Sequence, residues 1–281
     1  MDSKRGIIIN FTPTGMIPGK DTNPHVPITP DEIIKDTVKC ARLGANVVHL
    51  HARDADGSPT FDKRVYEEII LGVREKSDIV ISVSCSGRSH SEFEKRSEVL
   101  DLRGESKPEM ASLTLSSLNF NKIASVNSPD MIHSLAAKML KHGIKPEMEV
   151  FDVGMVNYSQ YMIRKGLITQ PFYFNVILGN IACAQAKPLH FGLIMEELPL
   201  NSVVTVGGVG DFQHSMNVLG LIFADGVRVG LEDTIYLDSG RMKLATNEKL
   251  VSRVVSHARN LDLRVATPDE VRERLNLPPL K

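Results

Sequence analysis

Short runs of β-branched and other apolar residues alternate with helical stretches along the whole chain of 281 residues. This alternation is typical of a parallel sheet whose strands are joined by crossover helices. We count eight such runs, which are Gly6 to Phe11, Asn46 to His51, Asp78 to Ser84, Glu109 to Thr114, Glu147 to Phe151, Phe172 to Leu178, Ser202 to Gly207 and Asp225 to Gly230. Eight βα units favour one closed (β/α)8 barrel of the TIM type, and a doubly wound open sheet is the alternative.

Helix start signals support this organisation at both ends of the chain. In Thr29-Pro30-Asp31-Glu32 the threonine can cap, the proline takes the first helical position, and the acids favour the positive end of the helix. The inward face of this helix is predicted to hold Ile33, Ile34, Val38 and Leu43. The same signal at Thr267-Pro268-Asp269-Glu270 predicts a terminal helix with Val271 and Leu275 inward. No Pro/Gly/Ser-rich linker interrupts the pattern, so we expect one domain over 1–281.

Composition excludes several classes of partner. The net charge is -1, both signs are interspersed and no Lys/Arg block occurs, which argues against nucleic acid or an anionic membrane and favours a small-molecule substrate. The opening MDSKRGIIIN has no signal-peptide pattern and no apolar run reaches transmembrane length, so we expect a cytoplasmic protein. Cys40, Cys85 and Cys183 form no CxxC pair, and we expect reduced packing residues.

Two histidines occupy alternate positions of an apolar run, at His49 and His51. Side chains at i and i+2 of a strand leave the same face, so both imidazoles point one way. A pair aimed together at the end of a barrel strand is a candidate pair of ligands for a divalent metal, most plausibly zinc. The alternative is a pair of core histidines hydrogen-bonded to their neighbours.

The eighth run ends in Arg228, Glu232 and Asp233, beside the place where a closed barrel delivers the histidines of the second run. Two imidazoles and one carboxylate make a three-ligand zinc site with an open position, and we choose Glu232 as the third ligand. Such a site can polarise a ketone. Arg228 can fork onto a carboxylate and Asp233 can act as a base, although either can instead form a structural ion pair.

Polar residues on the middle runs supply candidate substrate contacts. The fifth run carries acids at alternate positions, and an inward Glu149 suits a substrate ammonium, with a pair to Lys145 or Arg228 as the alternative. Hydroxyl groups near the ends of the third and fourth runs are suited to carboxylate or carbonyl oxygens, and they belong to Ser84, Ser112 and Thr114.

A glycine-rich turn follows the seventh run and contains Gly207, Gly208 and Gly210. Barrels often bind phosphate in this region through backbone amides, which points to a nucleotide or coenzyme A as cosubstrate. The glycines can equally serve only the turn.

The segments HLHARDADG, KPEMASLTLSSLNF, KPEMEVFDVGM and GVRVGLED together resemble the β-keto acid cleavage enzymes, typified by 3-keto-5-aminohexanoate cleavage enzyme. The similarity runs from the NFTPTG opening to the ATPDEVRERL ending. It implies a TIM barrel that is commonly a homo-oligomer, with a tetramer favoured. It also implies a divalent metal, usually zinc, and the conversion of a β-keto acid and acetyl-CoA into acetoacetate and a new acyl-CoA.

The resemblance also implies residue roles. The metal ligands fall on His49, His51 and Glu232, and the catalytic arginine and acid fall on Arg228 and Asp233. Glu149 matches the glutamate that meets the substrate's amino group in the aminohexanoate enzyme. The residues matching the carboxylate and carbonyl pocket are Ser84, Ser112 and Thr114.

Departures from the family pattern fall where substrate is recognised. The Thr-Gly-Gly turn after the third run is Cys85-Ser86-Gly87, the Asn after the Glu-Asp pair is Thr234, and Thr114 stands in place of an amide. Metal and base are therefore better determined than the keto acid. The competing functions are a metal-dependent hydrolase, which would need further histidines at later strand ends, and a non-catalytic barrel that binds metal or a small molecule.

Overall fold

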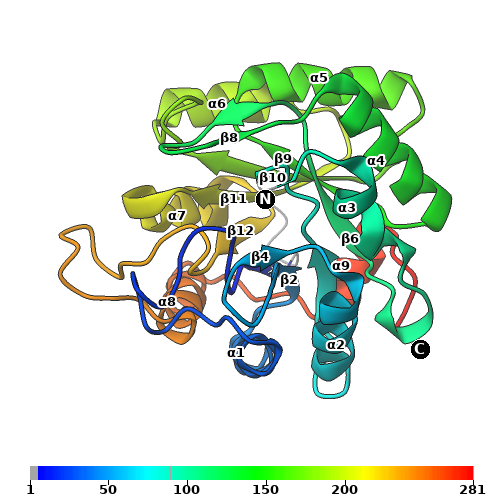
Figure 1. Cartoon of the computed structure of the whole chain (residues 1–281). Coiled ribbons are helices and arrows are strands. Elements are labelled where there is room, and N and C mark those ends of the chain that lie inside the picture. Colours follow the sequence, from blue (N-terminus) through cyan, green and yellow to red (C-terminus); the bar gives the residue numbers. More distant parts are fainter. Residues whose placement is uncertain (1–5, 89, 281) are drawn as a thin grey trace.

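The computed structural model describes residues 6–88 and 90–280 and contains the predicted closed barrel (Figure 1). All its strand pairs are parallel, in the order β1-β12-β11-β10-β9-β6-β5-β2. The barrel strands are β1 (Ile8–Phe11), β2 (Val47–Leu50), β5 (Val80–Val83), β6 (Met110–Thr114), β9 (Lys145–Val150), β10 (Phe172–Leu178), β11 (Ser202–Gly208) and β12 (Gly226–Val229). Closure excludes the open-sheet alternative. The outer bounds of the expected domain, at 1–5 and 281, lie outside the described residues.

Helices surround the barrel, and two small antiparallel sheets decorate it (Figure 1). The helices are α1 (Pro30–Leu43), α2 (Lys63–Arg74), α3 (Phe93–Ser97), α4 (Pro129–His142), α5 (Val153–Arg164), α6 (Pro188–Glu197), α7 (Gln213–Phe223), α8 (Asn247–Asn260) and α9 (Pro268–Leu275). Single 3₁₀ turns span Glu98–Asp101, Gly104–Ser106 and Gly210–Phe212. The small sheets pair β3 (Ala52–Arg53) with β4 (Pro59–Thr60), and β7 (Leu118–Asn119) with β8 (Ala124–Ser125).

All eight predicted strands are confirmed, with bounds that differ by one or two residues at most ends. Three starts differ by two residues: β1 and β5 begin two residues later than predicted, and β9 begins at Lys145 rather than Glu147 because Lys145 and Pro146 pair with β6. Both predicted helix starts are confirmed as capping boxes, with Thr29 and Glu32 opening α1 and Thr267 and Glu270 opening α9. Reciprocal side-chain bonds to the backbone fix these starts.

Apolar side chains fill the lower barrel, at the N-terminal ends of the strands. They form one cluster with α9, and its members include Ile8, Val47, Val80, Met110, Val271 and Leu275. Two residues further along these strands, where side chains face the same way, the buried residues are polar: Asn10, His49, Ser82 and Ser112. The barrel interior therefore changes from an apolar layer to a polar one in a single step of the pleat.

The C-terminal helix closes the apolar end. Arg272 of α9 is buried and donates to Glu109 just before β6, with Nε to Oε1 at 2.7 Å. Arg74 of α2 lies 3.5 Å from the other oxygen of Glu109. This cluster attaches the last helix to the barrel floor.

Two expectations from composition can be followed in the fold. The three cysteines are unpaired, with Cys40 and Cys85 buried and Cys183 half-buried. Within the described part of the chain, every helix is too short or too polar to cross a bilayer.

Candidate metal and active site

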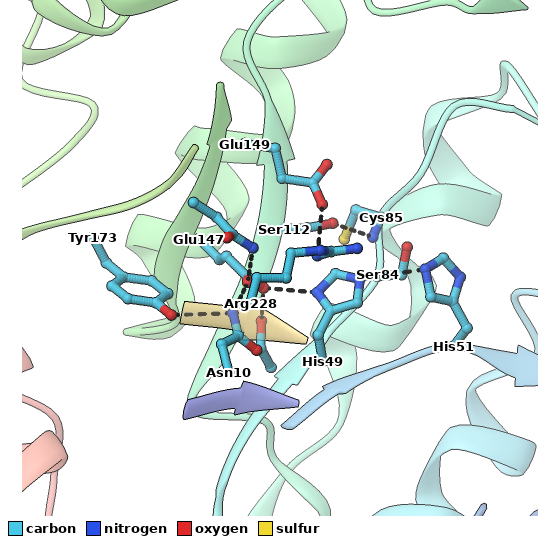
Figure 2. A network of polar contacts seen from close by, with 12 residues as sticks. Asn10, His49, His51, Ser84, Cys85, Ser112, Glu147, Glu149, Tyr173 and Arg228 are labelled. Carbon is cyan, nitrogen blue, oxygen red and sulfur yellow. Dashed lines mark hydrogen bonds and ion pairs between the residues drawn. The ribbon is translucent and has the colours of Figure 1, made fainter. Parts of the chain in front are cut away.

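The two histidines lie at the C-terminal end of β2 and enter the barrel from the same strand (Figure 2). Their Nε2 atoms are 3.3 Å apart and both rings are buried. Two imidazole nitrogens this close face one another only if a shared proton or a cation lies between or beside them. His49 and His51 therefore point into the same space, as their spacing predicted.

Glu232, in the loop after β12, completes the group. Its Oε1 lies 3.3 Å from Nε2 of His51, and its Oε2 lies 4.0 Å from Nε2 of His49. One ligand atom from each of the three residues fits within 4.8 Å of the others. Oε2 of Glu232 is buried, and no described residue donates a hydrogen bond to it. Because a buried carboxylate oxygen without a donor is costly, this arrangement fits a divalent cation.

The loop after β1 leaves space for Glu232. A Cβ atom on Gly15 would lie 2.4 Å from Cγ of Glu232, so any larger residue would push the carboxylate away. Arg53 holds this loop, because its Nη2 donates to the carbonyl oxygens of Gly15 and of Pro18, the latter at 2.7 Å. Gly15 and Arg53 lie in segments quoted above for the family resemblance, but the distance between them in the sequence does not indicate that they are in contact.

A fully buried carboxylate, Glu147 of β9, lies behind His49 (Figure 2). Its Oε2 accepts from Ser82 at 2.6 Å and lies 2.8 Å from Nδ1 of His49. Its Oε1 accepts from the amides of Asn10 at 2.6 Å and Asn175 at 2.9 Å. The carboxylate therefore requires a proton on Nδ1 of His49, which leaves Nε2 free to bind a metal.

The electrostatics of the pair favour positive charge between the two acids. Burial lowers the pKa of His49, but Glu147 and Glu232 outweigh it and raise that pKa to about 9. Burial raises the pKa of Glu147, yet the contact with His49 brings it down to about 2. Burial lowers the pKa of His51, which favours the neutral imidazole. A cation bound beside Glu232 would take the place of the proton on Nε2 of His49.

Arg228 and Asp233 form a bidentate ion pair beside the metal-ligand group. Nε of Arg228 donates to Oδ2 of Asp233 at 2.7 Å and Nη2 donates to Oδ1 at 3.2 Å. Nη2 also lies 2.8 Å from Oε1 of Glu232. Burial raises the pKa of Asp233 although Arg228 opposes it, and a raised pKa suits a carboxylate that must accept a proton. Nη1 of Arg228 has no hydrogen-bond partner among the described residues and is available to a ligand.

Glu149, expected to meet a substrate ammonium, is already engaged. Its Oε2 accepts from Thr114 at 2.6 Å and its Oε1 lies 3.7 Å from Nη1 of Arg228. Lys145, the other partner considered from the sequence, donates instead to the carbonyl oxygen of Pro171. The alternative of an Arg228 contact is therefore present in the structure.

These residues open into one cavity of about 590 Å³ at the C-terminal end of the barrel. Of the predicted hydroxyl residues, Ser84 and Thr114 line it and Ser112 does not. The hydroxyl of Ser112 instead accepts from the backbone N–H of Cys85 at 3.1 Å, which holds the loop after β5. The cavity wall also contains His51, Glu149, Arg228, Glu232 and Asp233, so the predicted catalytic residues share one space.

Of the glycine-rich segment that was predicted to be a turn, Gly207 and Gly208 lie in β11 and Gly210 begins the 3₁₀ turn that follows. The segment packs closely against this cavity. A Cβ on Gly207 would lie 3.0 Å from Cβ of Arg228, and one on Gly208 would lie 2.6 Å from the carbonyl oxygen of Phe212. Gly210 lines the cavity, but its N–H donates to the carbonyl oxygen of Asp233 at 2.7 Å. These contacts fit the interpretation in which the glycines serve close packing.

The network behind His49 was missed by the sequence reasoning. Its signal is a single polar residue inside an otherwise apolar strand: Asn10 in β1, Ser82 in β5 and Asn175 in β10. Strand register places Ser82 opposite His49. The side chains of Asn10 and Asn175 reach Glu147 across the barrel interior through hydrogen bonds. A single polar residue in a buried strand can therefore indicate a side chain that supports a candidate metal ligand through hydrogen bonds.

A family model described as beta-keto acid cleavage enzyme matches residues 6–277. The chain is 37% identical to 3-keto-5-aminohexanoate cleavage enzyme of Fusobacterium nucleatum over 273 residues, covering 96% of this chain and 98% of that one. It is 33% identical to 3-oxoadipate:acetyl-CoA acetyltransferase of Cupriavidus necator, covering 98% of this chain and 96% of that one.

Among solved structures, the barrel superposes on apo ObcA with a TM-score of 0.80 at 22% identity. The match covers 90% of this chain and 66% of the longer ObcA chain. At this identity the likeness supports the fold alone.

Proposed function

Because the chain belongs to the β-keto acid cleavage enzyme family, we propose that it converts a β-keto acid and acetyl-CoA into acetoacetate and a new acyl-CoA. The names of three relatives include acetyl-CoA, which supports acetyl-CoA as the second substrate. The single observation that carries the proposal is the convergence of His49, His51 and Glu232 with the Arg228–Asp233 pair on one cavity.

We propose zinc as the cation held by His49, His51 and Glu232, because two imidazoles and one carboxylate with room for a further ligand match catalytic zinc sites. The bound ion would supply a Lewis acid that polarises the substrate ketone. Glu147 holds the proton of His49 on Nδ1, so that Nε2 would be the nitrogen that binds the ion.

Asp233 takes a proton from C2 of the β-keto acid, between the ketone and the carboxylate. The resulting carbanion attacks the acetyl carbonyl of acetyl-CoA, which forms a carbon–carbon bond and releases the CoA thiolate. The thiolate then adds to the original ketone carbon, and the bond from that carbon to C2 breaks. Acetoacetate leaves after its carbanion recovers the proton from Asp233, and the rest of the keto acid leaves as acyl-CoA.

Arg228 stabilises the negative charge that develops during these steps. Among the described residues its Nη1 has no hydrogen-bond partner and only an ion-pair contact of 3.7 Å with Oε1 of Glu149. Its guanidinium remains charged because Asp233 and Glu232 raise its pKa well above the ordinary value despite burial. A preorganised cation that needs no reorientation contributes several kcal/mol in enzymes.

We further propose that acetyl-CoA enters past Gly210, which lines the cavity, with Gly207 and Gly208 shaping the turn below. The residues over 1–281 would act as one domain in a homo-oligomer, with a tetramer as the favoured state. A cytoplasmic location is supported by the use of acetyl-CoA and by three unpaired cysteines.

The test is to incubate zinc-loaded protein with acetyl-CoA and a panel of β-keto acids and to measure acetoacetate. We expect acetoacetate in stoichiometric amount with a new acyl-CoA, and loss of both in Asp233→Asn. Hydrolysis of an ester or amide without acetoacetate would favour the hydrolase. Ligand binding without turnover would favour the non-catalytic barrel.

A further inference from the structure

Arg88 follows the turn after β5, where the chain departs from the family pattern, and it extends into the cavity. Its guanidinium carbon lies 3.3 Å from the centroid of the Phe120 ring. Phe120 in turn packs edge-on against Phe151, with ring centroids 6.0 Å apart. Stacking on an aromatic ring fixes the guanidinium plane and leaves the N–H groups at its edge available to a planar anion.

Arg88 stacks on Phe120, and no carboxylate of the described residues is close enough to hold it in an ion pair. Within 6–88 and 90–280 it makes no hydrogen bond and no ion pair, although it is half-buried. The other arginines of the cavity differ, since Arg228 is paired with Asp233 and Arg241 with Asp211. Because Arg88 lines the cavity and its donors are not taken up by a described residue, its guanidinium is available to a ligand.

The turn that carries Arg88 is held rigidly. Arg96 is buried and donates to the carbonyl oxygen of Cys85 at 3.0 Å, to that of Val126 at 3.0 Å and to Oδ1 of Asn127 at 2.6 Å. Arg96 thus ties the turn to the segment that follows the β7–β8 hairpin, and this hairpin supplies Phe120. The stack is therefore preorganised from both sides.

We propose that Arg88 binds a second carboxylate at the far end of the substrate, so that the enzyme prefers dicarboxylic β-keto acids over amine-bearing ones. The proposal rests on the proposed function and names its substrate class. The carboxylate common to all β-keto acids already has Arg228 and the cation site. Glu149, the acid that would meet an ammonium, is engaged with Thr114, and an ammonium in this cavity would be repelled by Arg88.

The experiment compares kcat/KM on three β-keto acids of matched length: 3-oxoadipate, uncharged-tail 3-oxohexanoate and 3-keto-5-aminohexanoate. We expect the wild type to favour 3-oxoadipate. Arg88→Gln should lower kcat/KM for 3-oxoadipate by about 10- to 100-fold, the range for a lost charge-assisted hydrogen bond, and leave 3-oxohexanoate unchanged. Arg88→Lys should restore part of the loss, since it keeps the charge without the fork.

Arg64→Gln is the matched control, because this arginine is exposed at the start of α2 and pairs with Asp62 outside the cavity. The inference is overturned if the wild type prefers the aminohexanoate. It is also overturned if Arg88→Gln weakens all three acids equally, raises only the KM for acetyl-CoA, or changes nothing.

A failure of the proposed function is distinguishable from a failure of this inference. If no acid is turned over, calorimetric binding of 3-oxoadipate and 3-oxohexanoate to wild type and Arg88→Gln still decides the role of Arg88. Tighter binding of 3-oxoadipate that is lost only in Arg88→Gln supports it, and equal binding in both proteins refutes it.

Discussion

The two ends of the barrel each bury a carboxylate, but the two carboxylates have different partners. At the N-terminal end Glu109 is paired with Arg272 and approached by Arg74, so cation and anion compensate one another within the protein. Towards the C-terminal end Glu147 is surrounded by amides, a hydroxyl and His49, and the next shell holds Glu232 with an oxygen that no described residue satisfies.

The difference shows that a buried acid alone does not identify a functional site. Both carboxylates are hydrogen-bonded, as stability requires. The C-terminal end differs in the residues beyond Glu147. There the ligand atoms of His49, His51 and Glu232 converge, and Oε2 of Glu232 has no hydrogen-bond donor among the described residues. We therefore propose that Glu109 contributes to stability and that Glu147 orients a metal ligand, and mutations can separate the two roles.

The largest effect should come from the metal ligands themselves. We expect His49→Ala to remove bound zinc and to abolish acetoacetate formation, because two ligands of a three-residue site hold the ion poorly. The loss of affinity should exceed the roughly 100-fold upper range for residues behind the ligands. Zinc content after dialysis and the rate of acetoacetate formation measure it. Retention of zinc at wild-type occupancy would place the site elsewhere.

Glu147→Gln tests the carboxylate behind His49. A glutamine amide can donate to Nδ1 of His49, which moves the ring proton to Nε2 and blocks the metal-binding nitrogen. We expect zinc affinity to fall by about 10- to 100-fold, measured by competition with a chelating indicator. Unchanged affinity in a folded variant would make Glu147 a purely structural residue.

Glu109→Gln is the matched control from the opposite end. It leaves Arg272 buried without its counter-charge, so the free energy of unfolding should fall by about 3 kcal/mol. Denaturant unfolding measures this loss. Zinc affinity of the folded variant should equal that of the wild type. A loss of zinc affinity as large as that of Glu147→Gln would contradict the separate roles of Glu109 and Glu147.

The smallest effect is expected at Lys145, which is half-buried and begins β9. Burial lowers the pKa of this ammonium to about 8, so the unfolded chain binds more protons than the folded one between pH 8 and its ordinary pKa of 10.5. The wild type should therefore gain stability relative to Lys145→Met as pH rises through this window. If the difference in free energy of unfolding between the wild type and Lys145→Met is the same at pH 7 and at pH 10, the lowered pKa is contradicted.

Sequence patterns predicted the barrel and the shared direction of His49 and His51 because both depend on local periodicity. Eight apolar runs specify eight strands, and the spacing of His49 and His51 places both rings on one face. The position of Glu232 near the histidines was predictable because a closed barrel brings its last strand beside its first, which in turn pairs with the strand that carries the histidines. The roles of Asn10 and Asn175 were not, since only the three-dimensional register brings these strands to Glu147. Likewise, nothing local indicates that Arg88 stacks on Phe120, 32 positions later in the printed sequence.

The most direct test of the account is an anomalous diffraction map recorded at the zinc edge from crystals of protein purified with zinc. We predict one peak about 2.0–2.2 Å from Nε2 of His49, Nε2 of His51 and a carboxylate oxygen of Glu232. No peak at these three residues, or a peak bound by other side chains, would contradict the account.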